Sequence, residues 1–376
     1  MGHKSRACSF ITFFFLLISC GPQHSALARP FEPLSNNPTL LYPIPAPTGL
    51  GDPEWNRAWH LDHLGVREAW KYGKGTKNKI VAIVDSGIDY THPDLASNLA
   101  WNAAEWPVDG KDSDGNGAID DLIGWDFVRG KSLPYDRAGH GTFLAALAVA
   151  SDDNGEGAAG ICPLCTVLSA RFLNYEGMGD TEDAIAGIRF AIKHKPAVLN
   201  FSFSGEGFDS DLRDSINEAA AADIVVVVAA SNDGENVEHS DTYPAKFNLP
   251  NMITVAATDK QGRLWDGSNW GAKSVHIGAP GEDILGPWEG KYDVGSGTSN
   301  AAAIVSGAVA LIRSIRPSLT ALQTKQLFQS TVKQNKHLIG KIASGGVMDV
   351  AAAAACAADE ALPCLARGAR AHRARN

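Results

Sequence analysis

Three residues in this sequence carry the side chains that an acyl-transfer reaction requires: Asp85, His140 and Ser299. Such a reaction uses a nucleophile, a base that accepts the proton of the nucleophile, and a carboxylate that orients the base. We expect Ser299 to be the nucleophile, His140 the base and Asp85 the orienting carboxylate. Asn232 could donate its side-chain amide to the oxyanion, and the backbone N–H of Ser299 could be the second donor.

Each of these residues stands at the end of a predicted strand or the start of a predicted helix. Residues 80–84 form a continuous apolar run, which predicts a buried parallel strand with Asp85 at its carboxyl end. Residues 299–312 are apolar on every side, so the helix they form must be buried. Chemistry in open α/β sheets collects at the carboxyl ends of the strands, which supports a shared site.

Taken singly, each residue also has an ordinary structural explanation. Ser299 could cap its helix, since Ser and Thr before a helix are commonly N-caps. Asp85 could be a cap or turn residue, and His140 could be a structural or surface histidine. Only the combination favours chemistry over these alternatives.

The wider pattern predicts an α/β fold, doubly wound, with a mostly parallel sheet and helices on both faces. Predicted strands and helices alternate from residue 166 to residue 279, which is typical of such sheets. We expect one catalytic domain at 52–352, preceded by a signal peptide at 1–28 and a short pro-segment or linker at 29–51. Residues 353–376 form an Ala-rich and then basic tail.

The N-terminus has the pattern of an export signal. Lys4 and Arg6 precede a short apolar run at 10–18 that is too short to span a bilayer. Cleavage could follow Ala28, or a lipobox could leave Cys20 lipidated and anchor the protein to a membrane. We therefore expect export, with the protein secreted, periplasmic or lipid-anchored at the cell envelope.

Four cysteines remain after this signal: Cys162, Cys165, Cys356 and Cys364. The first two could form a redox pair, half of a zinc site or a local disulfide. No second Cys-x-x-Cys accompanies them, and export permits disulfides, so we expect local disulfides, with Cys356 paired to Cys364.

An acidic stretch carries the spacing of a calcium loop. Asp112, Asp114, Asn116 and Asp120 occupy loop positions one, three, five and nine, with Gly at position six. Position twelve is Ile123 rather than Glu, so this is not an EF-hand. An acidic turn without a metal is the alternative, but the convergent oxygens favour structural Ca²⁺.

Composition limits the classes of partner. The chain has 376 residues, 44% of them hydrophobic and 20% charged, as in an ordinary soluble protein with an ample core. A net charge of −9 argues against nucleic acid as the main partner. We also expect a monomer.

Several blocks resemble the subtilisin-like serine proteases, or subtilases, from about residue 55 to residue 350. Residues 81–95 are similar to the Asp block of the family, 140–142 to its His block, and 297–299 to its Ser block. Residues 229–232 resemble the strand that delivers the oxyanion Asn, and 243–245 the segment after it. The order Asp, His, Ser is that of subtilisin.

The resemblance implies an exported serine endopeptidase that forms an acyl-enzyme. In the family, segments matching Ser202, Phe203, Ser204 and Gly205 pair with an extended substrate, and those matching Ser231 and Thr242 line the specificity pocket. Since Gly is usual at the last two positions, we expect a pocket for small or medium apolar side chains. Asp94 matches a position that often binds calcium in the family, although it could equally be a turn residue.

The sequence also departs from the family. Asn300 and Ala303 stand where Met and Pro are usual, and Ser231 replaces a usual Gly before the oxyanion Asn. Two alternatives to a protease therefore stay open. One is a catalytically weakened binding protein with this fold, and the other is an esterase or amidase that uses the same triad.

Overall fold

The computed structural model describes residues 10–12, 48–362 and 364–365. Most of the expected signal peptide and pro-segment, including Cys20, and most of the basic tail lie outside the described residues. All statements about the structure concern the described residues.

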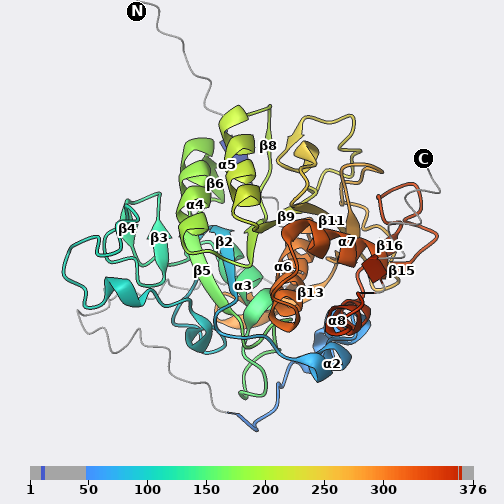
Figure 1. Ribbon diagram of the computed structural model, residues 1–376, viewed down its shortest axis with the longest axis horizontal. Coiled ribbons are helices and arrows are strands. Elements are labelled where there is room, and N and C mark those ends of the chain that lie inside the picture. The colour runs from blue at the N-terminus through green and yellow to red at the C-terminus, as the bar shows by residue number, and fades with distance from the viewer. Residues whose placement is uncertain (1–9, 13–47, 363, 366–376) are drawn as a thin grey trace, which may run out of the picture.

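A ten-stranded sheet forms the centre of the molecule (Figure 1), in the order β15-β16-β12-β11-β9-β7-β2-β5-β3-β4. Its central strands run parallel, and only β4 and β15, at the two edges, pair antiparallel with their neighbours. The strands of this sheet are β2 (Ile80–Asp85), β3 (Gly124–Asp126), β4 (Lys131–Ser132), β5 (Thr166–Arg171), β7 (Val198–Phe201), β9 (Val225–Ala229), β11 (Met252–Thr258), β12 (Ile277–Pro280), β15 (Lys333–Gln334) and β16 (Gly346–Val347).

The apolar runs of the central strands are explained by burial on both faces. Successive side chains of a strand point to opposite faces, so in β2 Val81 and Ile83 join one core and Ala82 and Val84 the other. The first core contains α3 and α6, and the second contains α4 and α5, which lie side by side in Figure 1. The predicted doubly wound architecture is confirmed.

Eight α-helices belong to the described residues. They are α1 (Trp59–His63), α2 (Val66–Ala69), α3 (His140–Val149), α4 (Thr181–Lys193), α5 (Ser210–Ala221), α6 (Thr298–Ile315), α7 (Ala321–Thr331) and α8 (Val350–Ala358). By length and composition α6 could cross a membrane, but 89% of it is buried inside the protein. It is the central core helix, as its uninterrupted apolar sequence predicts.

Three two-stranded ribbons complete the fold. They pair β1 (Phe10–Thr12) with β6 (Met178–Asp180), β8 (Gly205–Glu206) with β10 (Thr242–Tyr243), and β13 (Ile284–Trp288) with β14 (Lys291–Gly295). All three pairs are antiparallel.

The C-terminal boundary differs from the prediction. The Ala-rich stretch after residue 352 is not part of a tail, because α8 runs to Ala358 and buries Ala353, Ala354 and Ala357 against the core. A helix of small apolar side chains can approach its neighbours closely, and composition alone did not distinguish it from a frayed end. The folded domain therefore extends beyond 352.

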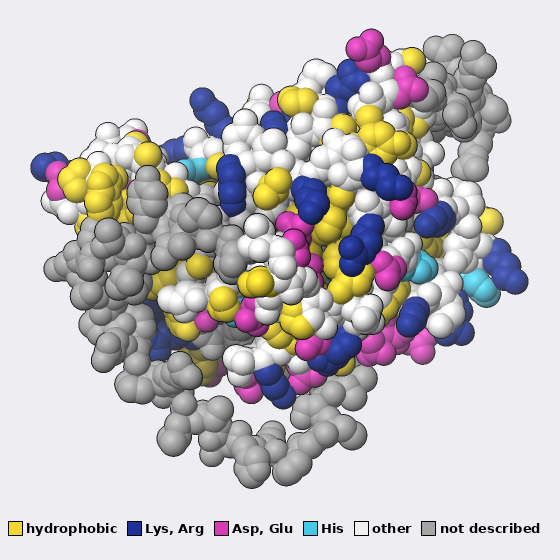
Figure 2. All heavy atoms as spheres, turned by 90° about the horizontal axis from the view of Figure 1, so that it is seen from below, with side chains coloured by type: hydrophobic (Ala, Val, Ile, Leu, Met, Phe, Trp, Pro, Cys, Tyr) yellow, Lys and Arg dark blue, Asp and Glu magenta, His cyan; other side chains and the backbone are white. Residues whose placement is uncertain are grey.

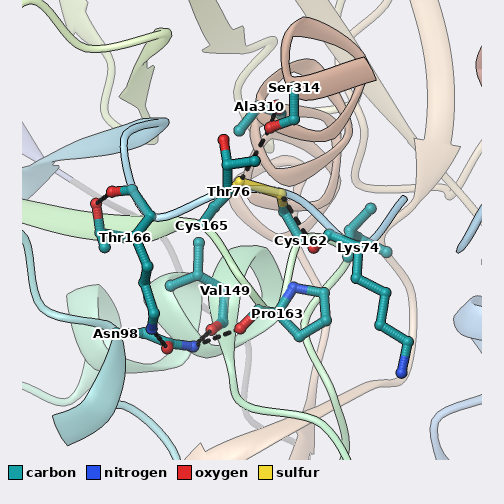
Figure 3. The surroundings of a disulfide bond; sticks show 12 residues. Lys74, Thr76, Asn98, Val149, Cys162, Pro163, Cys165, Thr166, Ala310 and Ser314 are labelled. Atoms are coloured by element: carbon teal, nitrogen blue, oxygen red, sulfur yellow. Dashed lines mark hydrogen bonds between the residues drawn. A yellow bond between two sulfur atoms is a disulfide. The ribbon is translucent and has the colours of Figure 1, made fainter. Parts of the chain in front are cut away.

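The four cysteines lie in the predicted pairs. The sulfur atoms of Cys162 and Cys165 are at bonding distance, as are those of Cys356 and Cys364. Figure 3 shows the first pair between the carbonyl of Lys74 and the hydroxyl of Ser314, which lies in the last turn of α6. The pair thus lies against the end of α6 that is remote from Ser299.

Candidate active site

The residues with candidate chemistry gather at the carboxyl edge of three neighbouring strands. Asp85 ends β2, Ser202 directly follows β7, and Asn232 lies just beyond β9. These strands are adjacent in the sheet, in the order β9-β7-β2. Parallel pairing therefore brings side chains from distant parts of the sequence to one edge.

Asp85 and His140 form a buried pair. The Nδ1 atom of His140 lies 2.7 Å from Oδ1 of Asp85, and neither side chain is exposed to solvent. The same Asp85 oxygen accepts a hydrogen bond of 2.7 Å from the backbone N–H of Ser86. A neutral imidazole that donates from Nδ1 has its lone pair at Nε2, which is the atom a general base uses.

Ser299 lies in the first turn of α6 and does not cap it. The N-cap residue is Gly297, and no side chain caps this helix end. The Ser299 hydroxyl instead donates to the carbonyl oxygen of Ser202 at 3.3 Å. The cap interpretation of Ser299 is therefore wrong, and its backbone N–H lies at the positive end of the helix dipole.

Asn232 is held in one orientation by the residue before Ser299. Its Oδ1 atom accepts hydrogen bonds from the backbone N–H and from the hydroxyl of Thr298, both at 2.8 Å. Because the amide oxygen is bound in this way, the Nδ2 group is the end of the side chain that can serve an oxyanion.

The predicted substrate-binding residues also lie together. β8, which starts at Gly205, pairs with β10, which starts at Thr242, and the hydroxyls of Ser204 and Ser231 are 3.1 Å apart. Ser231 has a φ of 83°, a left-handed conformation in which Gly is usual, and its hydroxyl also donates to Asp233 at 2.7 Å. The hydroxyls of Thr242 and Ser240 are 2.8 Å apart.

Phe203 differs from its neighbours. Its ring is buried and packs against the rings of Phe172 and Phe201, with centroids 4.9 and 5.2 Å away. The side chain of Phe203 therefore belongs to the core, and only its backbone is left for contact with a substrate.

The sequence did not predict the strands β1 and β6, which lie near the predicted substrate-binding residues. β1 pairs antiparallel with β6, with Phe10 opposite Asp180 and Thr12 opposite Met178, and it lies next to β8. An extended segment therefore fits between β6 and β8. Gly179 was the available sequence signal that two backbones approach closely here. A Cβ atom at this position would lie 2.5 Å from the carbonyl oxygen of Phe172.

The acidic loop brings together a different ligand set from the predicted one. Carboxylate oxygens of Glu105, Asp112 and Asp114 lie within 4.8 Å of one another. Asp120 is not among them, because its carboxylate accepts backbone N–H groups of Asp109 and Gly110. In the structure the Asp120 carboxylate is thus engaged by the backbone of its own loop, and Glu105 stands beside Asp112 and Asp114 instead.

Hydrogen bonds hold the side chains of this cluster in place. Asn116 donates from Nδ2 to Asp114 and to Asp121, at 3.0 and 3.1 Å. Glu105 is only 1% exposed and accepts backbone N–H groups of Ser113, Asp114 and Asp120. Three carboxylates and an amide oxygen are ligands that suit Ca²⁺, although in this structure the Asn116 oxygen accepts the N–H of Ala118.

Asp94 has no comparable arrangement. Its two oxygens accept hydrogen bonds from the Asn154 amide and the Tyr292 hydroxyl, both at 2.9 Å. Burial raises the pKa of Asp94 to about 7, and the nearby carboxylates Glu156 and Asp52 add to that rise. Because both oxygens face hydrogen-bond donors, the geometry does not present Asp94 as a cation ligand.

The two departures after the nucleophile are accommodated in the core. Asn300 is fully buried, and its Nδ2 donates to the Gly295 carbonyl at 2.9 Å. Ala303 is fully buried among apolar side chains of the first core. Asn300 thus ties the first turn of α6 to the strand that precedes it.

Comparison with known proteins gives consistent results. The sequence profile of the subtilase family matches residues 76–345. The chain is 34% identical to a thermophilic serine proteinase of Bacillus sp. (strain AK1), over 65% of this chain and 55% of that protein. It is 33% identical to thermitase of Thermoactinomyces vulgaris, over 69% of this chain and 83% of thermitase. The chain therefore spans little more than half the length of the first relative and most of the second.

A solved structure agrees with the sequence relatives. A protease from Pseudoalteromonas arctica PAMC 21717 superimposes with a TM-score of 0.68 at 26% identity, covering 82% of this chain and all of that one. The profile match covers more than half of the chain and contains all three candidate catalytic residues. This chain therefore belongs to the subtilase family of serine proteases.

Proposed function

We propose that the protein is a subtilisin-type serine endopeptidase whose catalytic triad is Asp85, His140 and Ser299. The observation that carries the proposal is the buried 2.7 Å pair of Asp85 and His140, with Ser299 in the first turn of α6, a helix that packs against α3. Regular elements hold all three residues: the end of β2, the start of α3 and the start of α6.

In the proposed reaction, the Ser299 hydroxyl leaves the Ser202 carbonyl and turns to His140. The proton passes to Nε2 of His140 while Oγ bonds to the substrate carbonyl carbon, and the oxyanion receives hydrogen bonds from Asn232 Nδ2 and Ser299 N–H. His140 then gives this proton to the leaving nitrogen as the C–N bond breaks. Water, activated in the same way, releases the acyl group and restores Ser299.

The test is covalent labelling of the full chain by a fluorophosphonate probe. The parent should react, and Ser299→Ala should not, while its melting temperature stays close to that of the parent. His140→Ala should lose nearly as much turnover, because triad residues act as a unit. The expected loss in kcat is about 10⁶-fold, which is the magnitude known for subtilisin, a member of the same family.

The outcomes separate the remaining alternatives. A folded parent that does not react with the probe would identify a binding protein that kept the fold. A parent that reacts but hydrolyses esters and not peptides would be an esterase. Labelling of Ser299→Ala at the rate of the parent would remove Ser299 as the nucleophile.

We propose that substrates are polypeptides that bind as an extended strand along Ser202–Gly205. The backbone carbonyl of Ser202 and the exposed ribbon of β8 and β10 are the main contacts, with β6 on the other side. Ser231 and Thr242 narrow the specificity pocket, because each adds side-chain atoms where the family usually has Gly. Small and medium apolar residues should therefore be preferred before the cleaved bond.

We propose that Ca²⁺ stabilises the loop that contains Asp112 and Asp114. Glu105, Asp112 and Asp114 would hold the ion, and Asn116 and Asp121 would orient them. The ion would be structural, because this loop leads to β3, whereas Asp85 ends β2, and the two strands are separated by β5. Asp120 and Asp94 are not included among the ligands.

Export, two local disulfides and a monomeric state complete the proposed description. The cysteine pairs support disulfides, and counting free thiols before and after reduction tests them. Acidic and basic side chains are interspersed on the face shown in Figure 2. N-terminal sequencing of the mature protein would distinguish cleavage after Ala28 from lipidation at Cys20.

A further inference from the structure

Asp136 is a buried carboxylate close to the triad, with no place in the mechanism described above. It lies between β4 and α3 and is only 5% exposed. One oxygen accepts hydrogen bonds from the Ser86 hydroxyl and from the backbone N–H groups of Ala138 and Gly139, at 3.0, 2.9 and 2.8 Å. The other accepts from the N–H and the hydroxyl of Thr142, at 2.8 and 2.7 Å.

These donors belong to the two chain segments that carry Asp85 and His140. Ser86 directly follows Asp85, whereas Gly139 and Thr142 flank His140. The Ser86 hydroxyl also accepts a hydrogen bond of 2.9 Å from the backbone N–H of Gly141. Asp136 and Ser86 therefore tie the end of β2 to the start of α3, across the segments that carry Asp85 and His140.

The backbones tied in this way are in direct contact. A Cβ atom at Gly141 would lie 2.1 Å from the carbonyl oxygen of Gly87, so only Gly fits there. Because the two segments are packed so closely, the surrounding atoms cannot compensate for a shift of one segment against the other if the Asp136 contacts are lost.

We propose that Asp136 is a positioning residue for the proteolytic reaction: its carboxylate fixes the geometry between Asp85 and His140. The inference rests on the proposed function. Asp136 touches neither the substrate nor the reacting atoms and acts only through the two segments that it binds.

Burial and hydrogen bonding act on Asp136 in opposite directions. Burial raises the pKa of Asp136 above its ordinary value, hydrogen bonds from Thr142 and Gly139 oppose that rise, and the Asp85 carboxylate adds to it. A buried carboxylate is costly unless it is hydrogen-bonded, and here five donors face it. Burial also raises the pKa of Tyr135, the residue before Asp136, and the Asp89 and Asp136 carboxylates add to that rise.

The alternative is that Asp136 only organises the first turn of α3, whose N-cap, Gly139, has no side chain. A cap alone would stabilise the fold without affecting the reaction. The two roles are separated by kcat and the pH profile rather than by stability, because the Ser86 hydroxyl also accepts the Gly141 N–H in the first turn of α3.

The main experiment is Asp136→Asn in the full chain, with kcat, KM, the pH profile and the melting temperature measured. The Asn side chain has nearly the size of the Asp side chain. Its N–H₂ group, however, must then face hydrogen-bond donors that the carboxylate had accepted. We expect kcat to fall by about 10²-fold with KM nearly unchanged, the size of effect typical for a displaced catalytic group. Loss of a negative charge beside His140 makes the imidazolium harder to form, so the acid limb of kcat/KM should move to lower pH.

A matched control is Asp349→Asn. Asp349 caps α8 by accepting the Ala352 N–H at 2.9 Å, far along the chain from the triad. This variant keeps the cap, since Asn also caps helices, but loses the charge paired with Lys333 at 3.4 Å, so it should lower the melting temperature slightly and leave kcat and the acid limb at the values of the parent. If Asp136→Asn changes only the melting temperature, as Asp349→Asn does, Asp136 is a cap and the inference fails.

Ser86→Ala keeps the inference testable if Asp136→Asn does not fold. It removes both hydrogen bonds of the Ser86 hydroxyl, to Asp136 and from the Gly141 N–H, but retains the Asp136 charge, so kcat should fall while the acid limb stays in place. Thr142→Ser retains the hydroxyl and should behave as the parent, whereas Thr142→Val should lose kcat. Unchanged kcat in both Ser86→Ala and Thr142→Val would overturn the inference. Failure of the parent itself to react with a fluorophosphonate would instead overturn the proposed function.

Discussion

The active-site edge and the acidic loop both gather acidic and amide side chains, but different forces hold them. Asp85, His140 and Ser299 stand on a strand and two helices, and pairing of distant strands brings them together. In the loop from Asn102 to Asp121, carboxylates bind backbone N–H groups of the same short segment. The first arrangement depends on the whole fold, and the second depends on local contacts and, in our proposal, on an ion.

Because of this difference, we expect substitutions in the two regions to affect different properties of the protein. Changes at the active-site edge should reduce turnover with little loss of stability, because the strands and helices around it remain packed. Changes in the loop should reduce stability with little effect on turnover, because β5 separates β3 from β2. A variant that lowers both would contradict this separation.

The largest expected effect in this comparison is that of Asn232→Ala. Loss of its amide removes one oxyanion donor, so kcat should fall by about 10²–10³-fold with little change in KM; this magnitude is known from subtilisin itself. The measurement is steady-state peptide hydrolysis, together with thermal unfolding.

Asn251→Ala is the matched control for that measurement. Asn251 is buried at the start of β11 and donates its amide to the carbonyl of Ile224 at 3.1 Å. It should cost stability and leave kcat unchanged. An unchanged kcat in Asn232→Ala would show that another group holds the oxyanion.

Removal of calcium tests the other region. A metal that binds only the folded state adds about 2.7 kcal/mol at a hundredfold excess over Kd, so chelation should lower the melting temperature. Glu105→Gln and Asp114→Ala should abolish most of that response, whereas kcat measured well below the melting temperature should stay constant. Differential scanning calorimetry with and without chelator measures the change.

Asp120→Ala is the control for the loop, because Asp120 is acidic and local but its carboxylate accepts the N–H groups of Asp109 and Gly110 and is not part of the cluster. Its melting temperature should be lower than that of the parent, since two N–H groups lose their acceptor, but its response to calcium should remain. If the parent shows no response to calcium, the loop is an acidic turn without a metal.

The smallest expected effect concerns the specificity pocket. Thr242→Gly should empty space that the Thr side chain fills, and overpacking of a large group costs about 1–3 kcal/mol. The gain for Phe before the cleaved bond should therefore be roughly ten- to a hundredfold in kcat/KM. A peptide set varied at that one position measures it, and Thr242→Ser should give an intermediate gain. A parent that already prefers Phe or Arg over Ala and Leu would contradict a narrow pocket.

The sequence predicted the regular parts of this molecule well, for physical reasons. Strands that are buried on both faces must be continuously apolar, and residues at their carboxyl ends must share one edge, so Asp85 and Asn232 could be placed. Directions of side chains in loops follow from backbone angles that no spacing reveals. This is why Asp120 was grouped with Asp112 and Asp114, whereas the structure places Glu105 beside them, and why the ring of Phe203 was not recognised as core.

The order of strands in the sheet has a consequence for how this protein can change. β2 is at the centre, and β3, which follows the acidic loop, is next to the edge strand β4. Loops at the edge of a sheet tolerate insertion and deletion, because few neighbouring residues constrain their length. The loop can therefore be lengthened, shortened or exchanged, which lets thermal tolerance evolve or be engineered while the central strands keep the chemistry constant.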